Sequence, residues 1–170
     1  MKKTIALSAI AMIAGLAHAD TLVIDVSAYD SWNFQGDAQN DIASILVGAG
    51  ASITNIAWDV TITSEAPSWA EEFTMGFFGN SEVVQVAPGD AFEANFSNYA
   101  GNQASGIVLG GSGMLDIEFY EQFFDDIAFG IDTYIEQGST VTLSGSGFVP
   151  TPGSLAVLGL GGLVAGRRRR

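Results

Sequence analysis

Apolar and polar residues alternate through most of the chain between residues 20 and 148. The clearest stretch is 114–120, where three large apolar residues alternate with two carboxylates and a tyrosine, as in a strand with one buried face. A period of two, or a short apolar run between turn residues, predicts further strands over 21–27, 42–47, 52–63, 73–78, 82–86, 91–96, 107–109 and 140–148. The small polar segment 98–105 predicts a loop, and 121–129 fits a short helix or a loop.

Short strands separated by glycine-rich turns, without a long amphipathic helix, indicate a single all-β domain. We predict one antiparallel β-sandwich, jelly-roll-like in its connections, over residues 20–148. The sequence shows no internal repeat of the length that a solenoid needs. Thr61-x-Thr63 and Thr140-x-Thr142 are too sparse for a regular ladder of threonines.

The first 19 residues have the three parts of a secretory signal peptide. Met1-Lys2-Lys3 is positively charged, residues 5–16 are apolar, and Ala17-His18-Ala19 is an Ala-x-Ala cleavage site. A retained membrane anchor would need a longer apolar run. We therefore expect signal peptidase to cleave after Ala19, so that the mature protein begins at Asp20.

The last segment, residues 149–170, also has three parts. Pro150-Thr151-Pro152 is followed by an uncharged apolar run over 153–166 and by the cluster Arg167, Arg168, Arg169 and Arg170. A helix of about 14 residues spans about 21 Å, against about 30 Å of hydrocarbon, so this short C-terminal apolar helix is a marginal transmembrane segment. The arginines favour the cytoplasmic side, which would leave the body outside.

These residues resemble the PEP-CTERM sorting signal of Gram-negative bacteria that make extracellular polysaccharide. The resemblance covers about the last 22 residues, and it implies that a membrane protease-transpeptidase, the exosortase, removes the tail and passes the body to the cell surface or matrix. Thr151 stands where the family usually has Glu. This tail type is also known as the ice-binding protein C-terminal motif, which describes the tail and not what the body binds. An ordinary C-terminal membrane anchor is the alternative.

Removal of both ends leaves a body without cations. The six Lys and Arg residues and the single His all lie in the two ends, whereas all 19 acidic residues lie in the body, whose formal charge is therefore −19. The chain also has no cysteine. This composition excludes Ser-His-Asp and Cys-His catalysis, a lysine Schiff base and a histidine-ligated zinc site. Nucleic-acid binding is excluded as well, because nothing in the body neutralises phosphates.

Only carboxylates remain as candidates for chemistry, and they are densest over 116–136. This acidic group contains Asp116, Glu118, Glu121, Asp125, Asp126, Asp132 and Glu136. Asp116 and Glu118 share one strand face, and with Asp125 and Asp126 they are candidate calcium ligands, although no Asp-x-Asp-x-Asp-Gly loop is present. A solvated acidic face is the alternative without a metal or cofactor. A carboxylate pair also suits a glycosidase, but no Arg, Lys or His supports one here.

The tryptophans are candidate sugar-stacking residues. Trp58 lies in an apolar strand, which predicts a core position, whereas Trp69 follows Pro67-Ser68 and precedes two glutamates, which predicts exposure. An exposed indole stacks on the apolar face of a sugar ring. Trp69 is therefore the candidate carbohydrate contact, with core packing as the alternative.

Together these features predict an exported, non-enzymatic protein of the cell surface or extracellular polysaccharide matrix, anchored transiently in the inner membrane by its tail. Its processing partners would be signal peptidase and exosortase. One alternative is a module that binds polysaccharide or calcium, and another is a secreted hydrolase that uses two carboxylates.

Overall fold

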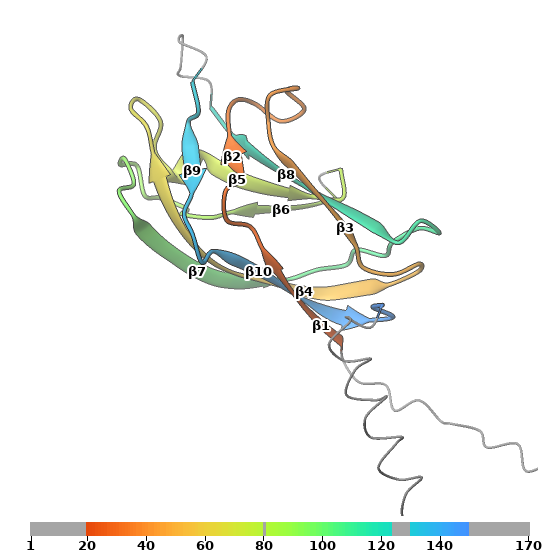
Figure 1. The fold of residues 1–170 in the computed structure, drawn as a ribbon. Helices are drawn as coiled ribbons and strands as arrows, with labels where there is room; N and C mark the ends of the chain where they lie inside the picture. Colours follow the sequence, from red (N-terminus) through yellow and green to blue (C-terminus); the bar gives the residue numbers. More distant parts are fainter. Residues whose placement is uncertain (1–19, 80, 124–129, 150–170) are drawn as a thin grey trace, which may run out of the picture.

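The computed structural model describes residues 20–79, 81–123 and 130–149, so the predicted signal peptide and the sorting tail with its apolar helix lie outside it. The regular secondary structure of these residues is antiparallel strands and one short 3-10 helix, η1 (Figure 1). The elements are β1 (Asp20–Asp25), β2 (Asp30–Ser31), β3 (Ile42–Leu46), β4 (Ser52–Ser64), η1 (Ala70–Glu72), β5 (Phe73–Phe77), β6 (Glu82–Gln85), β7 (Ser97–Ala104), β8 (Met114–Glu121), β9 (Thr133–Ile135) and β10 (Thr140–Ser146).

The main strands pair as nested antiparallel partners. β1 pairs with β10, β3 with β8, β4 with β7 and β5 with β6. One sheet has β1, β10, β4 and β7 side by side, and the facing sheet has the order β3-β8-β5-β6. The short strands β9 and β2 extend the first sheet beside the C-terminal part of β4. Two facing sheets built from nested partners make a jelly roll, which confirms the predicted antiparallel β-sandwich.

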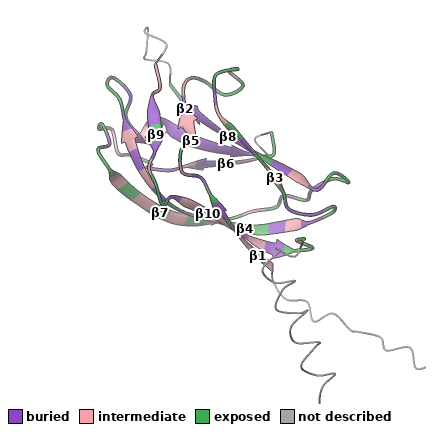
Figure 2. Ribbon diagram, viewed as in Figure 1, coloured by how far each residue is buried: buried purple, intermediate pink, exposed green. Residues whose placement is uncertain are grey.

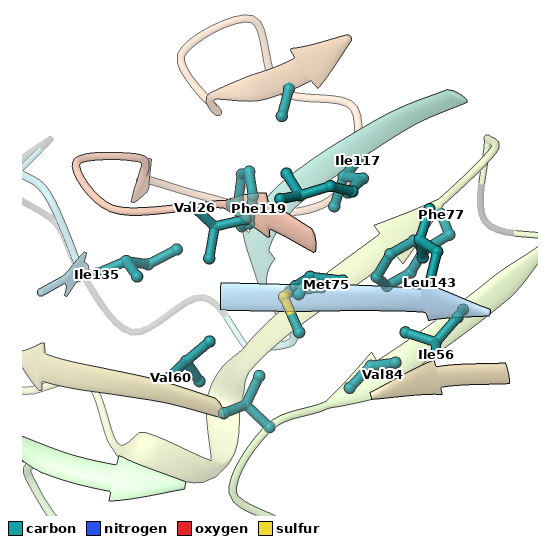
Figure 3. Packing of buried hydrophobic residues seen from close by; sticks show 14 of the residues in the cluster. Val26, Ile56, Val60, Met75, Phe77, Val84, Ile117, Phe119, Ile135 and Leu143 are labelled. Atoms are coloured by element: carbon teal, nitrogen blue, oxygen red, sulfur yellow. The ribbon is translucent and has the colours of Figure 1, made fainter. Parts of the chain in front are cut away.

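The core lies between the two sheets and is made by the apolar set of each alternating strand. Phe73, Met75 and Phe77 of β5 are fully buried, and so are Ile117 and Phe119 of β8 (Figures 2 and 3). Each fully buried side chain of this size contributes about 1.5–3 kcal/mol relative to exposure. Because the chain has no cysteine and the body no cation, this burial replaces disulfides and salt bridges as the source of stability.

Most predicted strands begin and end within one or two residues of the observed ones. The predictions for two adjacent segments, 91–96 and 98–105, are wrong. Residues 91–96 form a loop and 97–104 form β7, whereas the sequence predicted a strand and then a loop. Phe92 and Phe96 gave 91–96 an apolar character, but their side chains are exposed. The small polar residues of β7 become a strand because β4 offers them an edge to pair with.

Smaller differences follow the same pattern. The predicted strand over 107–109 is reduced to an isolated bridge between Val108 and Ser52. The two very short strands β2 and β9 were not predicted, since two or three residues show no measurable period. The segment predicted as helix or loop begins with Glu121 as the last residue of β8, and its residues 124–129 lie outside the described ranges.

Candidate functional site

Asp116 and Glu118 lie together on the outer face of the four-stranded sheet, as predicted. In β8, Leu115, Ile117 and Phe119 point into the core, and the two carboxylates between them point outward. Ile42 of β3 lies opposite Glu118 on one side, and Gly76 of β5 lies opposite it on the other. Since Gly76 has no side chain, the sheet surface is hollowed beside Glu118.

This hollow has a volume of about 170 Å³ and is lined by Ile42, Gly76, Gly79, Asp116 and Glu118. Glu118 Oε1 accepts hydrogen bonds from the backbone N of Gly36 at 2.5 Å and from Asn40 Nδ2 at 3.0 Å. Both bonds hold the carboxylate at the rim, so its charge is fixed in position.

Asp116 is held by a single side chain. Its Oδ1 accepts the hydroxyl hydrogen of Ser44 at 2.5 Å, and Ser44 lies opposite it on β3. Within the described residues the second oxygen of each carboxylate, on Asp116 and on Glu118, accepts no further hydrogen bond. Two fixed carboxylates beside an apolar wall and a glycine floor suit a small ligand with hydroxyl donors or a hard cation.

The other two predicted calcium ligands, Asp125 and Asp126, lie outside the described ranges. Among residues 20–79, 81–123 and 130–149, no three His, Cys, Asp or Glu side chains are grouped as the ligands of a metal ion. The structure therefore places two of the four predicted calcium ligands, Asp116 and Glu118, in one hollow. A calcium site stays a prediction.

Trp69 lies on a different element and does not line the hollow. It is the N-cap of η1, where its backbone N donates to Glu72 Oε2 at 2.9 Å, and its side chain is 45% exposed. The neighbouring backbone N of Ala70 donates to the carbonyl of Phe92 at 2.9 Å, and the Phe92 side chain is 74% exposed. This end of the sandwich thus displays exposed rings of a kind that stack on sugars.

Trp58 packs against the core, as its place in an apolar strand predicts. It is partly buried against the core, and its ring lies over Gly101 of β7. A Cβ at Gly101 would lie 2.4 Å from Trp58 Cζ2, so the indole fills the space that the glycine leaves. Trp58 therefore packs the edge of the core.

Glu121, which the sequence placed in the solvated acidic group, is the most deeply buried carboxyl of the described residues. It is 1% exposed, because it continues the inward set of β8 after Phe119. Ser31 Oγ donates a hydrogen bond to its Oε1. Its Oε2 and the neighbouring Thr133 Oγ1 are buried without a hydrogen bond.

This environment disfavours the charged form of Glu121. Burial raises the pKa of Glu121 to about 8, the carboxylates of Asp132 and Glu72 raise it further, and the hydrogen bond from the Ser31 hydroxyl acts in the opposite direction. The group is therefore protonated at neutral pH. Extending the alternation of β8 by one step past Phe119 would have revealed this residue.

Comparison with known proteins adds little to this description. No family model matches the chain, and no curated protein matches its sequence. Among solved structures, the tobacco streak virus coat protein is similar at a TM-score of 0.35 and 9% identity, over 77% of this chain and 89% of that one. An infectious bursal disease virus (Gx strain) structure is similar at a TM-score of 0.25 and 14% identity, over 91% of this chain and 51% of that one. The β-sandwich assignment rests on this chain's own strands.

Proposed function

We propose that the chain is an exported, non-enzymatic protein of the cell surface or extracellular polysaccharide matrix, which exosortase sorts through the C-terminal tail. The proposal is supported by the order of the sequence, in which a signal peptide, a cation-free body, Pro150-Thr151-Pro152, an apolar run and an arginine cluster follow one another. In the described residues no helix has the length and apolarity needed to cross a membrane.

The observation that carries the proposal is how the body ends. The backbone N of Val149, the residue before the motif, donates to the carbonyl of Val47 at 2.7 Å, and the N of Phe148 donates to Asp20 Oδ2 at 2.9 Å. The first residue of the mature protein and the last residue of the body thus meet at one end of the sandwich (Figure 1). Pro150, the first residue of the motif, therefore follows directly in sequence on a residue that is hydrogen-bonded to the body.

Removal of the tail would leave the core of the described residues in place. Among the described residues, every buried member of the core lies between Ile24 and Leu143, before the tail begins. A body that keeps its whole core after cleavage is what a sorting mechanism requires. It would leave the membrane as a folded, highly acidic unit.

A tail variant tests the proposal. Replacing Arg167 to Arg170 with serine should abolish retention and processing, whereas Thr151→Glu, which restores the family's usual residue, should be processed at least as efficiently as the wild type. Fractionation of the native host into inner membrane, outer membrane and medium would measure both effects. A serine variant that is distributed among the fractions like the wild type would contradict the proposal.

Ligand binding at the hollow is the second candidate function, because Asp116 and Glu118 converge there with acceptor oxygens to spare. Calorimetric titration of the full chain with calcium, and separately with the host polysaccharide, would detect it. Glu118→Gln should remove the binding, while Asp25→Asn, a change of the same kind on β1, should not. Equal binding by both variants would show that the ligand is held elsewhere or only by general acidity.

The hydrolase alternative has less support from the geometry. A glycosidase needs one carboxyl with a raised pKa in contact with the substrate. Glu121, whose pKa is raised, is 1% exposed, and Asp30, whose pKa is raised by burial and by Asp41, does not line the hollow. The exposed pair Asp116 and Glu118 offers carboxylates without a cationic or imidazole partner.

A further inference from the structure

Among the residues that the structure describes, β7 is an edge strand with no partner on its outer side. It runs for eight residues, Ser97–Ala104, and pairs only with β4 (Figure 1). Tyr99 and Gln103 fix it from the inner face, since the Tyr99 hydroxyl donates to Asp90 Oδ2 and Gln103 Nε2 donates to the carbonyl of Val83 at 3.3 Å. The edge is therefore held in an extended form, ready to accept another strand.

The register identifies which backbone groups are unpaired. Asn55 lies opposite Ala104, so Thr54 lies opposite Ser105, and the bond from Ser105 N to Thr54 O at 3.0 Å marks a hydrogen-bonded pair. Such pairs recur at every second residue of an antiparallel ladder. Ser97, Tyr99, Gly101 and Gln103 therefore face β4. The free N–H and C=O groups belong to Asn98, Ala100, Asn102 and Ala104.

β7 also differs from the rest of the body in charge. None of its eight residues is ionisable at neutral pH, although the body has 19 acidic residues and no cation. Natural edge strands are usually protected by charges or prolines, and β7 has neither. The edges β1 and β6 both carry carboxylates, at Asp20, Asp25 and Glu82. β3 is uncharged but shorter, and the hydroxyl of its Ser44 donates a hydrogen bond to Asp116.

We propose that β7 pairs with β7 of a second copy of this chain, antiparallel about a two-fold axis at Gly101. In that register Ala100 lies opposite Asn102 of the second copy, and Asn98 lies opposite Ala104. All four free residues then exchange their backbone hydrogen bonds, and the sheet continues from one sandwich into the next. The strand is self-complementary, as a two-fold interface requires.

The side chains are compatible with this register. Asn98, Ala100, Asn102 and Ala104 are all exposed and small, so the outer face brings only alanine and asparagine together. On the inner face Gly101 lies opposite Gly101 of the second copy, so no two side chains meet at the axis. No like charges meet directly across the strand pair.

Charge indicates where on the surface two copies would meet. Two bodies of formal charge −19 repel each other over most of their surfaces, and an uncharged edge is where they approach with least repulsion. Salt shortens the range of that repulsion, from about 10 Å at 0.1 M to about 3 Å at 1 M. The dimer should therefore become tighter as salt rises, unlike an association that depends on opposite charges.

Sedimentation velocity on the full chain in mild detergent tests the proposal. A single strand pair buries less than a standard interface, so dimerisation in the micromolar range is expected and concentrations from about 5 to 500 μM should be covered. Asn102→Pro removes one free N–H and should weaken the dimer at least about tenfold. The control Val23→Pro makes the same change on the free edge of β1, opposite Thr142 of β10, and should leave the dimer unchanged.

Ala100→Asp serves as a second variant that keeps every backbone group. It places two carboxylates at diagonal positions across the axis, so it should weaken the dimer at low salt and less at high salt. Far-UV circular dichroism of all variants would show that the sheets persist. A wild type that stays monomeric over the whole range overturns the proposal, and so does a dimer that survives Asn102→Pro.

The absence of cysteine allows a positional check. Ala100→Cys should be joined to a second copy by a short bismaleimide, whereas Thr21→Cys on β1 should not. Joining at both positions, or at Thr21 alone, would contradict pairing through β7. Joining of Ala100→Cys to a different protein in the host, without self-joining, would contradict the choice of a second copy.

Discussion

Glu121→Gln should make the protein more stable at alkaline pH and remove much of its pH dependence. The variant has nearly the same shape as the wild type but cannot ionise. Glutamine also keeps a side-chain oxygen that can accept the hydrogen bond from the Ser31 hydroxyl. The fold therefore loses little and no longer has to hold a carboxyl away from water.

The sign follows from the pKa of Glu121, which burial raises from 4.5 to about 8. A carboxyl whose pKa is higher in the folded state binds its proton more tightly there, so its contribution to stability is complete below pH 4.5. That contribution is lost as the pH rises through about 8. The difference between these values corresponds to about 5 kcal/mol, a large share of the stability of a typical domain.

Urea unfolding followed by tryptophan fluorescence, at pH values from about 4.5 to 9, would measure the effect. The difference in unfolding free energy between Glu121→Gln and wild type should be small at the acid end and should grow by several kcal/mol toward pH 9. Asp25→Asn is the control: hydrogen bonds from Ser27 lower the pKa of Asp25, so its difference from wild type should stay constant above about pH 6. A pH-independent difference for Glu121→Gln would refute the reasoning.

Three further substitutions test the packing and the exposed aromatic site. Gly101→Ala should destabilise the protein by about 1–3 kcal/mol in urea, because its Cβ would lie 2.4 Å from the Trp58 ring; an unchanged midpoint would mean that the indole moves aside freely. Phe119→Ala should cost about 3–5 kcal/mol, since the ring is fully buried between Tyr29 and Phe73. Trp69→Ala should change stability by less than about 1 kcal/mol, and an unfolded variant would show that the ring is core; if polysaccharide binds at this ring and not at the hollow, Trp69→Ala loses binding in a pull-down assay and Glu118→Gln keeps it.

The strands with large alternating side chains could be predicted because their pattern is set by burial on one face. β4 and β8 show this, and in β8 even the outward position of Asp116 and Glu118 follows from the alternation. β7 could not be predicted, because small polar residues have weak strand preference and its pairing with β4 supplies the order. The strand predicted over 91–96 is wrong because Phe92 and Phe96 give the segment a strand-like composition, although both side chains are exposed.

The candidate site shows a similar division. That Asp116 and Glu118 share a face is a local property of one strand, whereas the hollow beside them depends on Gly76 lying opposite Glu118 in another strand. The register between two strands that are distant in sequence cannot be predicted from either segment alone. Glu121 is the intermediate case, because the period of β8 places it inward but its charge argues for the surface.

The most direct test of the proposed sorting is the intact mass of the protein recovered from envelope and medium of the native host, with and without the exosortase. Sorting predicts a product that begins at Asp20 and ends near Pro150 when the enzyme is present, and a form that still contains Arg170 when it is absent. The same mass in both strains, with Arg170 retained, would contradict sorting and identify the tail as a permanent anchor.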